Sequence, residues 1–289
     1  MTPPHPGFLE PLAFDFVQRG LLGGSLVAIL CGVVGTWVVI RGMAFLGEAL
    51  AHGMLPGVAL ATVLSLPVLL GGTLSAIAMS LGIGMLQRRA RLSYDSSIGL
   101  LFVSMLALGV IIISHSGSFA TDATAILFGD ILAIDADDII VLAVAAGLGV
   151  ATAALFHRSF VASSVDPRVA AVLRLRPQVG QVALVGLVTL AVVASYQAVG
   201  SMLVVGLLLA PAIAAGHWTT RISARMALAA GFGIAAVTLG LLASWYAATA
   251  AGASVAAAAI LLATSSWVVR AGLTSARSRM PATRRRQTV

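Results

Sequence analysis

The chain has 289 residues, of which 60% are hydrophobic and 9% are charged, and its formal net charge is +7. A soluble domain carries about 25% charged residues, so this composition excludes one and indicates a polytopic membrane protein. All seventeen basic residues are arginine. The absence of lysine excludes a P-loop, because the lysine of that motif contacts the nucleotide phosphates. We therefore expect a chain that is not an enzyme and does not itself hydrolyse ATP.

Apolar runs of about twenty residues, the length that crosses a bilayer as a helix, recur along the chain. Such runs favour helices, because the strands of a membrane barrel alternate in polarity instead. They predict an all-α polytopic bundle that forms a single membrane domain over 1–289. The nine predicted spans cover 17–40, 44–66, 68–87, 96–115, 139–160, 178–197, 199–217, 226–246 and 252–270.

The second span carries a charged pair, Glu48 and His52. Positions four apart lie on one face of a helix, and a carboxylate with an imidazole suits Mn²⁺, Zn²⁺ or Fe²⁺. Gly53, Pro56 and Gly57 follow directly and predict a kink that frees backbone carbonyls, as occurs where a pathway crosses a membrane. Two readings stay open for the pair: a metal site, or a hydrogen bond that only locks helix packing.

Acidic side chains gather in the connection 116–138, which is predicted to be a loop helix or a re-entrant segment. The readings are a solvated loop, an entrance that attracts cations, and a docking surface for an extracytoplasmic partner. The acidic residues are Asp122, Asp130, Asp135, Asp137 and Asp138.

The stretch VDPRVAAVLRLRPQ, residues 165–178, predicts a short helix in a later connection. Asp166 can cap it, Pro167 suits the first helical position and Pro177 ends it. Such an amphipathic helix lies either on the membrane surface or in a groove of a cytoplasmic partner. Its apolar side is formed by Val169, Val172 and Leu173, and Arg168 lies elsewhere.

The arginines orient the chain in the membrane. With the C-terminus in the cytoplasm, sixteen of the seventeen lie inside and only Arg19 lies outside. This predicts a short extracytoplasmic N-terminus, 1–16, and a basic C-terminal tail, 271–289, at the lipid surface. In the span 199–216, Gly200, Gly206 and Gly216 permit close approach of helices.

Five segments together resemble the integral membrane subunits of ABC transporters for zinc, manganese and iron uptake. They occur in that family's order and cover most of the chain. They are RGMAFLGEALAHGMLPGVALA (41–61), YDSSIGLLFVSMLALGVIII (94–113), ILFGDIL (126–132), VDPRVAAVL (165–173) and VGSMLVVGLLLAPAIAA (199–215).

The resemblance implies a type II ABC importer-like permease in a bacterial inner membrane, paired with a second copy of itself. It implies a cytoplasmic ATPase homodimer that uses ATP, an extracytoplasmic solute-binding protein, membrane lipid around the spans and no nucleic acid. No cofactor is expected to be tightly bound, and Mn²⁺ or Zn²⁺, with iron as a further candidate, is the transported substrate.

The resemblance also assigns residues. The family's opening motif has an Asp four residues before the His, where this chain has Glu48, while His52, Pro56 and Gly57 match. That pair is implied to coordinate the metal within the membrane. The helix at 165–176, with Asp166, Pro167, Arg168, Val169, Val172 and Leu173, resembles the family's coupling helix for the ATPase. It departs from the family at Arg174, where a glycine ordinarily ends the helix.

Two other functions remain open. One is a stand-alone, proton-coupled secondary transporter with Glu48 as its proton relay. The other is an intramembrane enzyme with Glu48 and His52 as metal ligands, although the sequence has no HExxH motif to support it. Co-purification of an ATPase separates the permease from both alternatives.

Overall fold

The computed structural model describes residues 10–90, 92–116, 129–165 and 177–278. All regular structure in these ranges is helical. The elements are η1 (Glu10–Ala13), α1 (Asp15–Ile40), α2 (Ala44–Gly53), α3 (Leu55–Val63), α4 (Val68–Arg89), α5 (Tyr94–Ser116), α7 (Ala136–Leu155), α8 (His157–Val165), α10 (Pro177–Gly216), α11 (Ile222–Ala247) and α12 (Ala251–Ser278).

The described part of the chain contains nine helical stretches that are long and apolar enough to cross a membrane. They match the nine predicted spans, so the all-α polytopic fold is confirmed. Two details differ from the predicted ranges. The fifth span ends at Leu155 and a separate helix, α8, begins at His157. The helix α12 continues to Ser278, into the predicted C-terminal tail.

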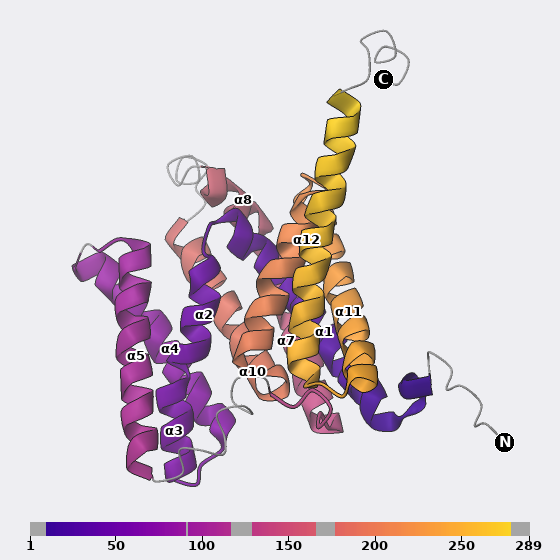
Figure 1. Cartoon of the computed structure of the whole chain (residues 1–289). Helices are drawn as coiled ribbons and strands as arrows, with labels where there is room; N and C mark the ends of the chain where they lie inside the picture. The colour runs from indigo at the N-terminus through magenta and orange to yellow at the C-terminus, as the bar shows by residue number, and fades with distance from the viewer. Residues whose placement is uncertain (1–9, 91, 117–128, 166–176, 279–289) are drawn as a thin grey trace, which may run out of the picture.

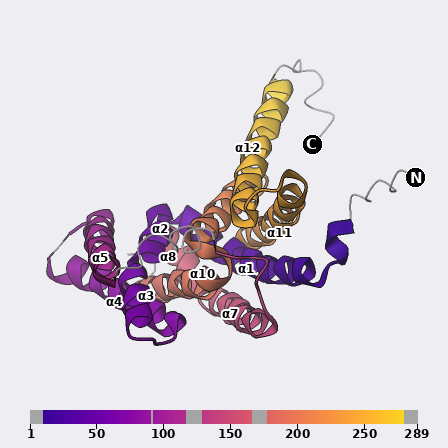
Figure 2. The same ribbon diagram turned by 60° about the horizontal axis from the view of Figure 1, so that its bottom comes forward.

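Helix α1 lies in the middle of the bundle, packed against α7, α10 and α11 (Figures 1 and 2). In its most apolar 18-residue stretch, 72% of the residues are buried, against 17% in the corresponding stretch of α5 and 22% in that of α12. Helices α3, α4 and α5 form a group on one side, and α11 and α12 lie on the other. Two helix groups therefore flank a central core made of α1 and α10.

The two ends of the bundle differ in charge. The upper end in Figure 1, here named the arginine-rich end, holds the connections 41–43 and 217–221, the end of α4 and the start of α5. The lower end, here named the acidic end, holds the start of α7, where Asp135, Asp137 and Asp138 lie. Arg19, near the start of α1, also belongs to the acidic end. Residues 166–176 of the predicted helix 165–176, Asp122 and the remainder of the tail, 279–289, lie outside the described residues.

Helix α10 supplies two spans, Gln178–Tyr196 and Ala198–Gly216, which run in opposite directions around Gly200 (Figure 1). Gly200 has φ 70° and ψ 167°, a backbone conformation that residues with a Cβ rarely adopt. The backbone of Gly129 lies directly against the backbone at Val199 and Gly200, so a side chain at Gly129 would collide with it. Only glycine at these two positions allows the reversal and the close approach together.

Candidate metal site

Glu48 and His52 form a direct pair on α2. The Nε2 atom of His52 lies 3.0 Å from Oε1 of Glu48. The side chains are 15% exposed for His52 and 29% exposed for Glu48, so both are partly shielded. The His52 ring stands edge-on to Phe102 of α5, with ring centroids 5.7 Å apart. The helix thus presents one carboxylate and one imidazole at a single point inside a span, as their spacing predicted.

The second span is interrupted for a single residue immediately after this pair. Helix α2 ends at Gly53, Met54 joins the two helices, and α3 begins at Leu55 with Pro56 in its first turn. Pro56 has no N–H and therefore cannot donate to the carbonyl four residues earlier, that of His52. Met54 keeps helical backbone angles, φ −75° and ψ −23°, and its N–H donates to the Leu50 carbonyl. The span therefore continues past Pro56, and the donor that Pro56 lacks is the one the histidine carbonyl would use.

The glycines around the break hold α2 and α3 close to α4. A Cβ at Gly53 would collide with the thioether of Met79, and one at Gly57 would collide with the carbonyl of Gly71. The hydroxyl of Ser75, also on α4, donates to the Gly53 carbonyl at 2.7 Å. Small residues thus permit close helix packing, and one carbonyl at the break already has a donor.

The described residues bring no third His, Cys, Asp or Glu side chain to this pair. Among them, no group of three or more His, Cys, Asp or Glu side chains lies close enough to hold a metal ion. Cys31 is buried elsewhere, in α1. The described part of this chain therefore brings two side chains of ligand type to this point, and a metal there would need water, backbone oxygens or a second chain to complete its coordination shell.

Four of the acidic residues predicted as an outer entrance are described, and Asp130, Asp135, Asp137 and Asp138 lie at the acidic end, away from α2. Two of them start a helix: Asp135 accepts from the Asp138 backbone N–H at 2.8 Å, and Asp138 accepts from that of Asp135 at 3.3 Å. This reciprocal arrangement is a capping box for α7. Asp130 accepts from the backbone N–H of Leu132, and Asp137 is exposed in the first turn. Helix capping thus accounts for Asp135 and Asp138 without any ligand.

Sequence reasoning did not single out Arg41, which lies at the end of α1 and leads into α2. Its Nε donates to the hydroxyl of Ser164 on α8 at 3.0 Å, and its Nη1 donates to the amide oxygen of Gln181 on α10 at 3.1 Å. Partial burial lowers the pKa of Arg41 below its ordinary value, and nearby Tyr94 opposes that shift. Since Ser164 precedes 166–176 and Gln181 follows it, Arg41 ties both flanks of that segment to the start of α2. The sequence signal was a lone arginine directly between two spans.

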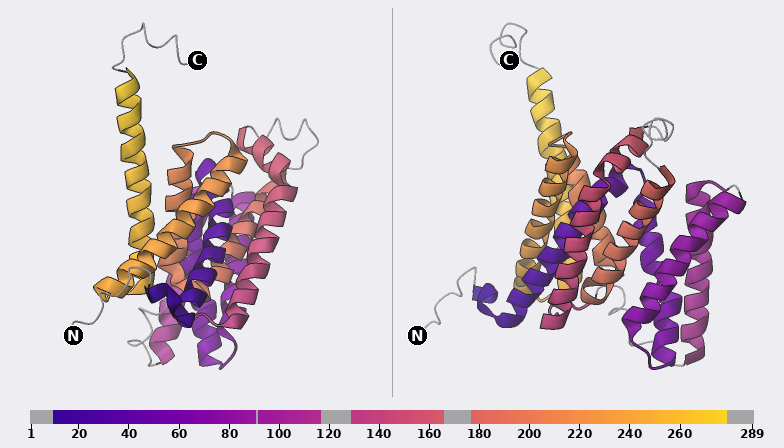
Figure 3. Two further views of the ribbon diagram at one scale, coloured as in Figure 1. Left: turned by 90° about the vertical axis from the view of Figure 1, so that its right-hand side faces the viewer. Right: turned by 180° about the vertical axis from the view of Figure 1, so that it is seen from behind.

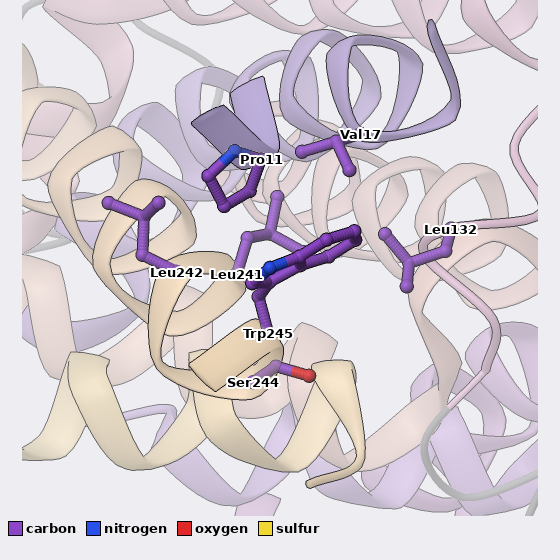
Figure 4. Close-up of a pocket in the computed structure, with 7 residues that line it drawn as sticks. All are labelled: Pro11, Val17, Leu132, Leu241, Leu242, Ser244 and Trp245. Atoms are coloured by element: carbon purple, nitrogen blue, oxygen red, sulfur yellow. The ribbon is translucent and has the colours of Figure 1, made fainter. Parts of the chain in front are cut away.

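Two cavities lie outside this pair. One, of about 230 Å³, is at the acidic end between the start of α1 and the end of α11, and it is lined mainly by apolar side chains such as Val17, Leu241 and Trp245 (Figure 4). Trp245 stacks on Phe14 with ring centroids 5.3 Å apart, as aromatic residues gather at membrane interfaces. The other, of about 1050 Å³, lies between α4 and the first half of α10.

A multi-pass helical bundle that carries a carboxylate–imidazole pair inside one of its spans is typical of a membrane transport protein. The particular family follows from comparison with known proteins. The model of the ABC 3 transport family matches residues 13–270, and the chain belongs to this family.

Named relatives agree with that membership. The chain is 35% identical to the manganese transport system membrane protein MntC of Listeria monocytogenes over 88% of this chain and 91% of the relative. It is 30% identical to the chelated iron transport system membrane protein YfeD of Yersinia pestis over 82% of this chain and 80% of the relative. The solved structure of PsaBC from Streptococcus pneumoniae in complex with Fab matches with a TM-score of 0.79 and 30% identity. That match covers 90% of this chain and 94% of the other.

Proposed function

We propose that this chain is the membrane permease subunit of an ABC importer for a divalent transition metal, Mn²⁺ or Zn²⁺, and that Glu48 and His52 hold the metal during its passage. The observation that carries the proposal is the 3.0 Å pairing of an imidazole nitrogen with a carboxylate oxygen inside a span, directly before its one-residue interruption at Met54. Family membership and relatives named for manganese and iron transport support the substrate class.

The pair changes partners when metal binds. A metal at Nε2 of His52 uses the lone pair of that nitrogen, so the nitrogen cannot carry a proton at the same time. The hydrogen bond to Glu48 is then replaced by two bonds to the metal. Two ligands bind weakly, which suits a transporter because the ion must also leave.

The glycines and the proline act on the surroundings of the metal. Gly53 and Gly57 keep α2 and α3 in contact with α4, and Pro56 leaves the His52 carbonyl without its helical donor. Water, this carbonyl or a second copy of the chain completes the coordination shell. In this proposal the three residues shape the passage, and the two charged residues bind the ion.

Energy comes from a partner. The proposed coupling residues Asp166, Pro167, Arg168, Val169, Val172 and Leu173 dock against a cytoplasmic ATPase homodimer, and an extracytoplasmic binding protein delivers the metal. Asp122, Asp130, Asp135, Asp137 and Asp138 are the proposed outer attraction for the cation. Among the described acids, Asp137 is the best candidate for attracting the cation, because it is exposed and takes no part in the capping box.

The test is uptake of Mn²⁺ and Zn²⁺ by vesicles that contain this chain, its ATPase and its binding protein, with ATP hydrolysis followed in parallel. His52→Ala is expected to assemble and hydrolyse ATP but to move no metal. Unchanged uptake by His52→Ala would contradict the site. Uptake that needs a proton gradient and no ATP would favour the secondary transporter with Glu48 as its relay.

A further inference from the structure

The cavity between α4 and the first half of α10 lies on a face that no function has yet explained. It runs along α4 from Thr73 to Arg89 and along α10 from Gln178 to Val193. At 1.5 Å per residue, the α4 wall is about 24 Å long. The right view of Figure 3 shows the molecule from behind, with the group containing α4 and α5 at one side of the bundle.

The charge of the cavity is positive at one end only. Arg88 and Arg89, both exposed, line it at the arginine-rich end, together with the amide side chains of Gln178 and Gln181. No acidic side chain is among the described residues that line it. A site with two guanidinium groups and no carboxylate repels a divalent metal and attracts an anion.

The remaining wall is apolar and faces outward. Leu81 is 69% exposed, Val182 62% and Ile77 44%, and all three line the cavity. The two hydroxyls halfway along it, those of Ser80 and Thr189, are 2.9 Å apart, and each also lies within hydrogen-bond distance of a carbonyl of its own helix. These hydroxyls are satisfied, so this stretch offers an incoming molecule apolar contact.

We propose that this cavity, here named the lipid groove, binds one anionic phospholipid of the cytoplasmic leaflet. The acyl chains lie along Ile77, Leu81 and Val182, and the phosphate lies at Arg88 and Arg89. One leaflet with its headgroups is about 20–22 Å thick, close to the length of the groove. The positive-inside rule places the arginine-rich end in the cytoplasm, and basic pockets between membrane helices on that side bind anionic headgroups.

A second copy of the chain fits the groove less well. Two copies inserted in the same orientation bring their arginine-rich ends to the same side of the membrane. A contact through the groove would then place Arg88 and Arg89 beside other arginines of the partner, and like charges at an interface are unfavourable. A phospholipid supplies the opposite charge. This inference is independent of metal transport, because none of these residues belongs to the proposed metal site.

The first experiment counts lipids on the intact complex of this chain with its ATPase, purified in mild detergent from a membrane that contains phosphatidylglycerol and cardiolipin. Phospholipids per complex are measured by mass spectrometry. Arg88→Gln combined with Arg89→Gln is expected to lower retained anionic lipid on the order of tenfold, since each arginine near the surface attracts it. Arg158→Gln combined with Arg221→Gln removes the same charge from exposed positions that do not line the groove and is expected to retain the wild-type amount.

A second pair of variants leaves the charges intact. Gly186 lines the groove, and a Cβ there meets nothing within 4 Å, so Gly186→Leu fills the groove without a clash of that atom. It is expected to lower retained anionic lipid. Gly147→Leu on α7 is the control, because Gly147 is equally open and does not line the groove.

Three results would overturn the proposal. Equal lipid retention by wild type and by both groove variants would show that no lipid is held there. Equal enrichment of phosphatidylcholine in a mixed membrane would remove the role of the two arginines. A disulfide between two copies carrying Leu81→Cys in a Cys31→Ala background would show that the groove is covered by a second chain.

Discussion

The proposed metal site and the lipid groove both place polar groups within the membrane region, yet their charges are opposite. Helix α4 separates them: Met79 packs against Gly53 beside the metal site, and the next residue, Ser80, lines the groove. One side offers a carboxylate and an imidazole, which suit a metal cation, and the other offers two guanidinium groups, which suit an anionic headgroup. The two sides of α4 can therefore serve ligands of opposite charge, because Glu48 and His52 lie on its neighbour α2, whereas Arg88 and Arg89 lie in the last turn of α4 itself.

The largest expected effect separates the two sites directly. Glu48→Gln and His52→Gln should each lower metal uptake on the order of 100-fold or more, since even outer-shell partners of a metal often contribute 10–100-fold. Retained anionic lipid should stay at the wild-type level in both variants. A parallel loss of lipid would show that the pair and the groove form one site. The measurement combines vesicle uptake with lipid mass spectrometry on the same preparations.

The next effect concerns the packing of α3 on α4. Gly57→Val introduces a branched side chain against the Gly71 backbone, and the free energy of unfolding should fall by about 3 kcal/mol because the two helices must separate. Gly147→Val is the matched control, since its Cβ meets nothing within 4 Å. Unfolding in mixed detergent micelles measures both. Equal stability of the two variants would mean that α3 and α4 can move apart at little cost.

Arg41 connects a wall of the groove to the start of the metal-site helix, because Gln181 both lines the groove and accepts from Arg41. Arg41→Met removes the hydrogen bonds to Ser164 and Gln181, and we expect a loss of about 2 kcal/mol in unfolding free energy.

Arg41→Lys keeps the charge but lacks the planar fork that reaches two acceptors, so it should restore only part of the stability. Full restoration by lysine would show that charge alone matters at this position. The free energies of unfolding of wild type, Arg41→Met and Arg41→Lys are measured in micelles, and the value for Arg41→Lys is compared with the other two.

The smallest expected effect concerns the hydrogen bond that joins α4 to the end of α2. Ser75→Ala removes the donor to the Gly53 carbonyl and should lower the unfolding free energy by about 1 kcal/mol. If that carbonyl joins the metal shell, the variant will also change the apparent metal affinity in uptake. Ser80→Ala, on the groove side of the same helix, is the control and should leave metal affinity unchanged.

Much of this structure could be predicted from the sequence. The nine spans follow from apolar runs of sufficient length, and the missing backbone donor in the second span follows from Pro56. The pairing of Glu48 with His52 follows from helical spacing. Each of these depends on residues close together in the chain, so no knowledge of the packing between spans was needed.

The partners of those elements were decided by the tertiary structure alone. In a membrane helix, the face toward lipid and the face toward other helices are both apolar, so periodicity does not reveal which helix packs where. The contact of Gly57 with Gly71, the acceptors of Arg41 and the groove beside Arg88 all join segments far apart in the sequence. The sequence by itself determined the spans and the chemistry they carry, and the packing between spans determined which of these groups meet.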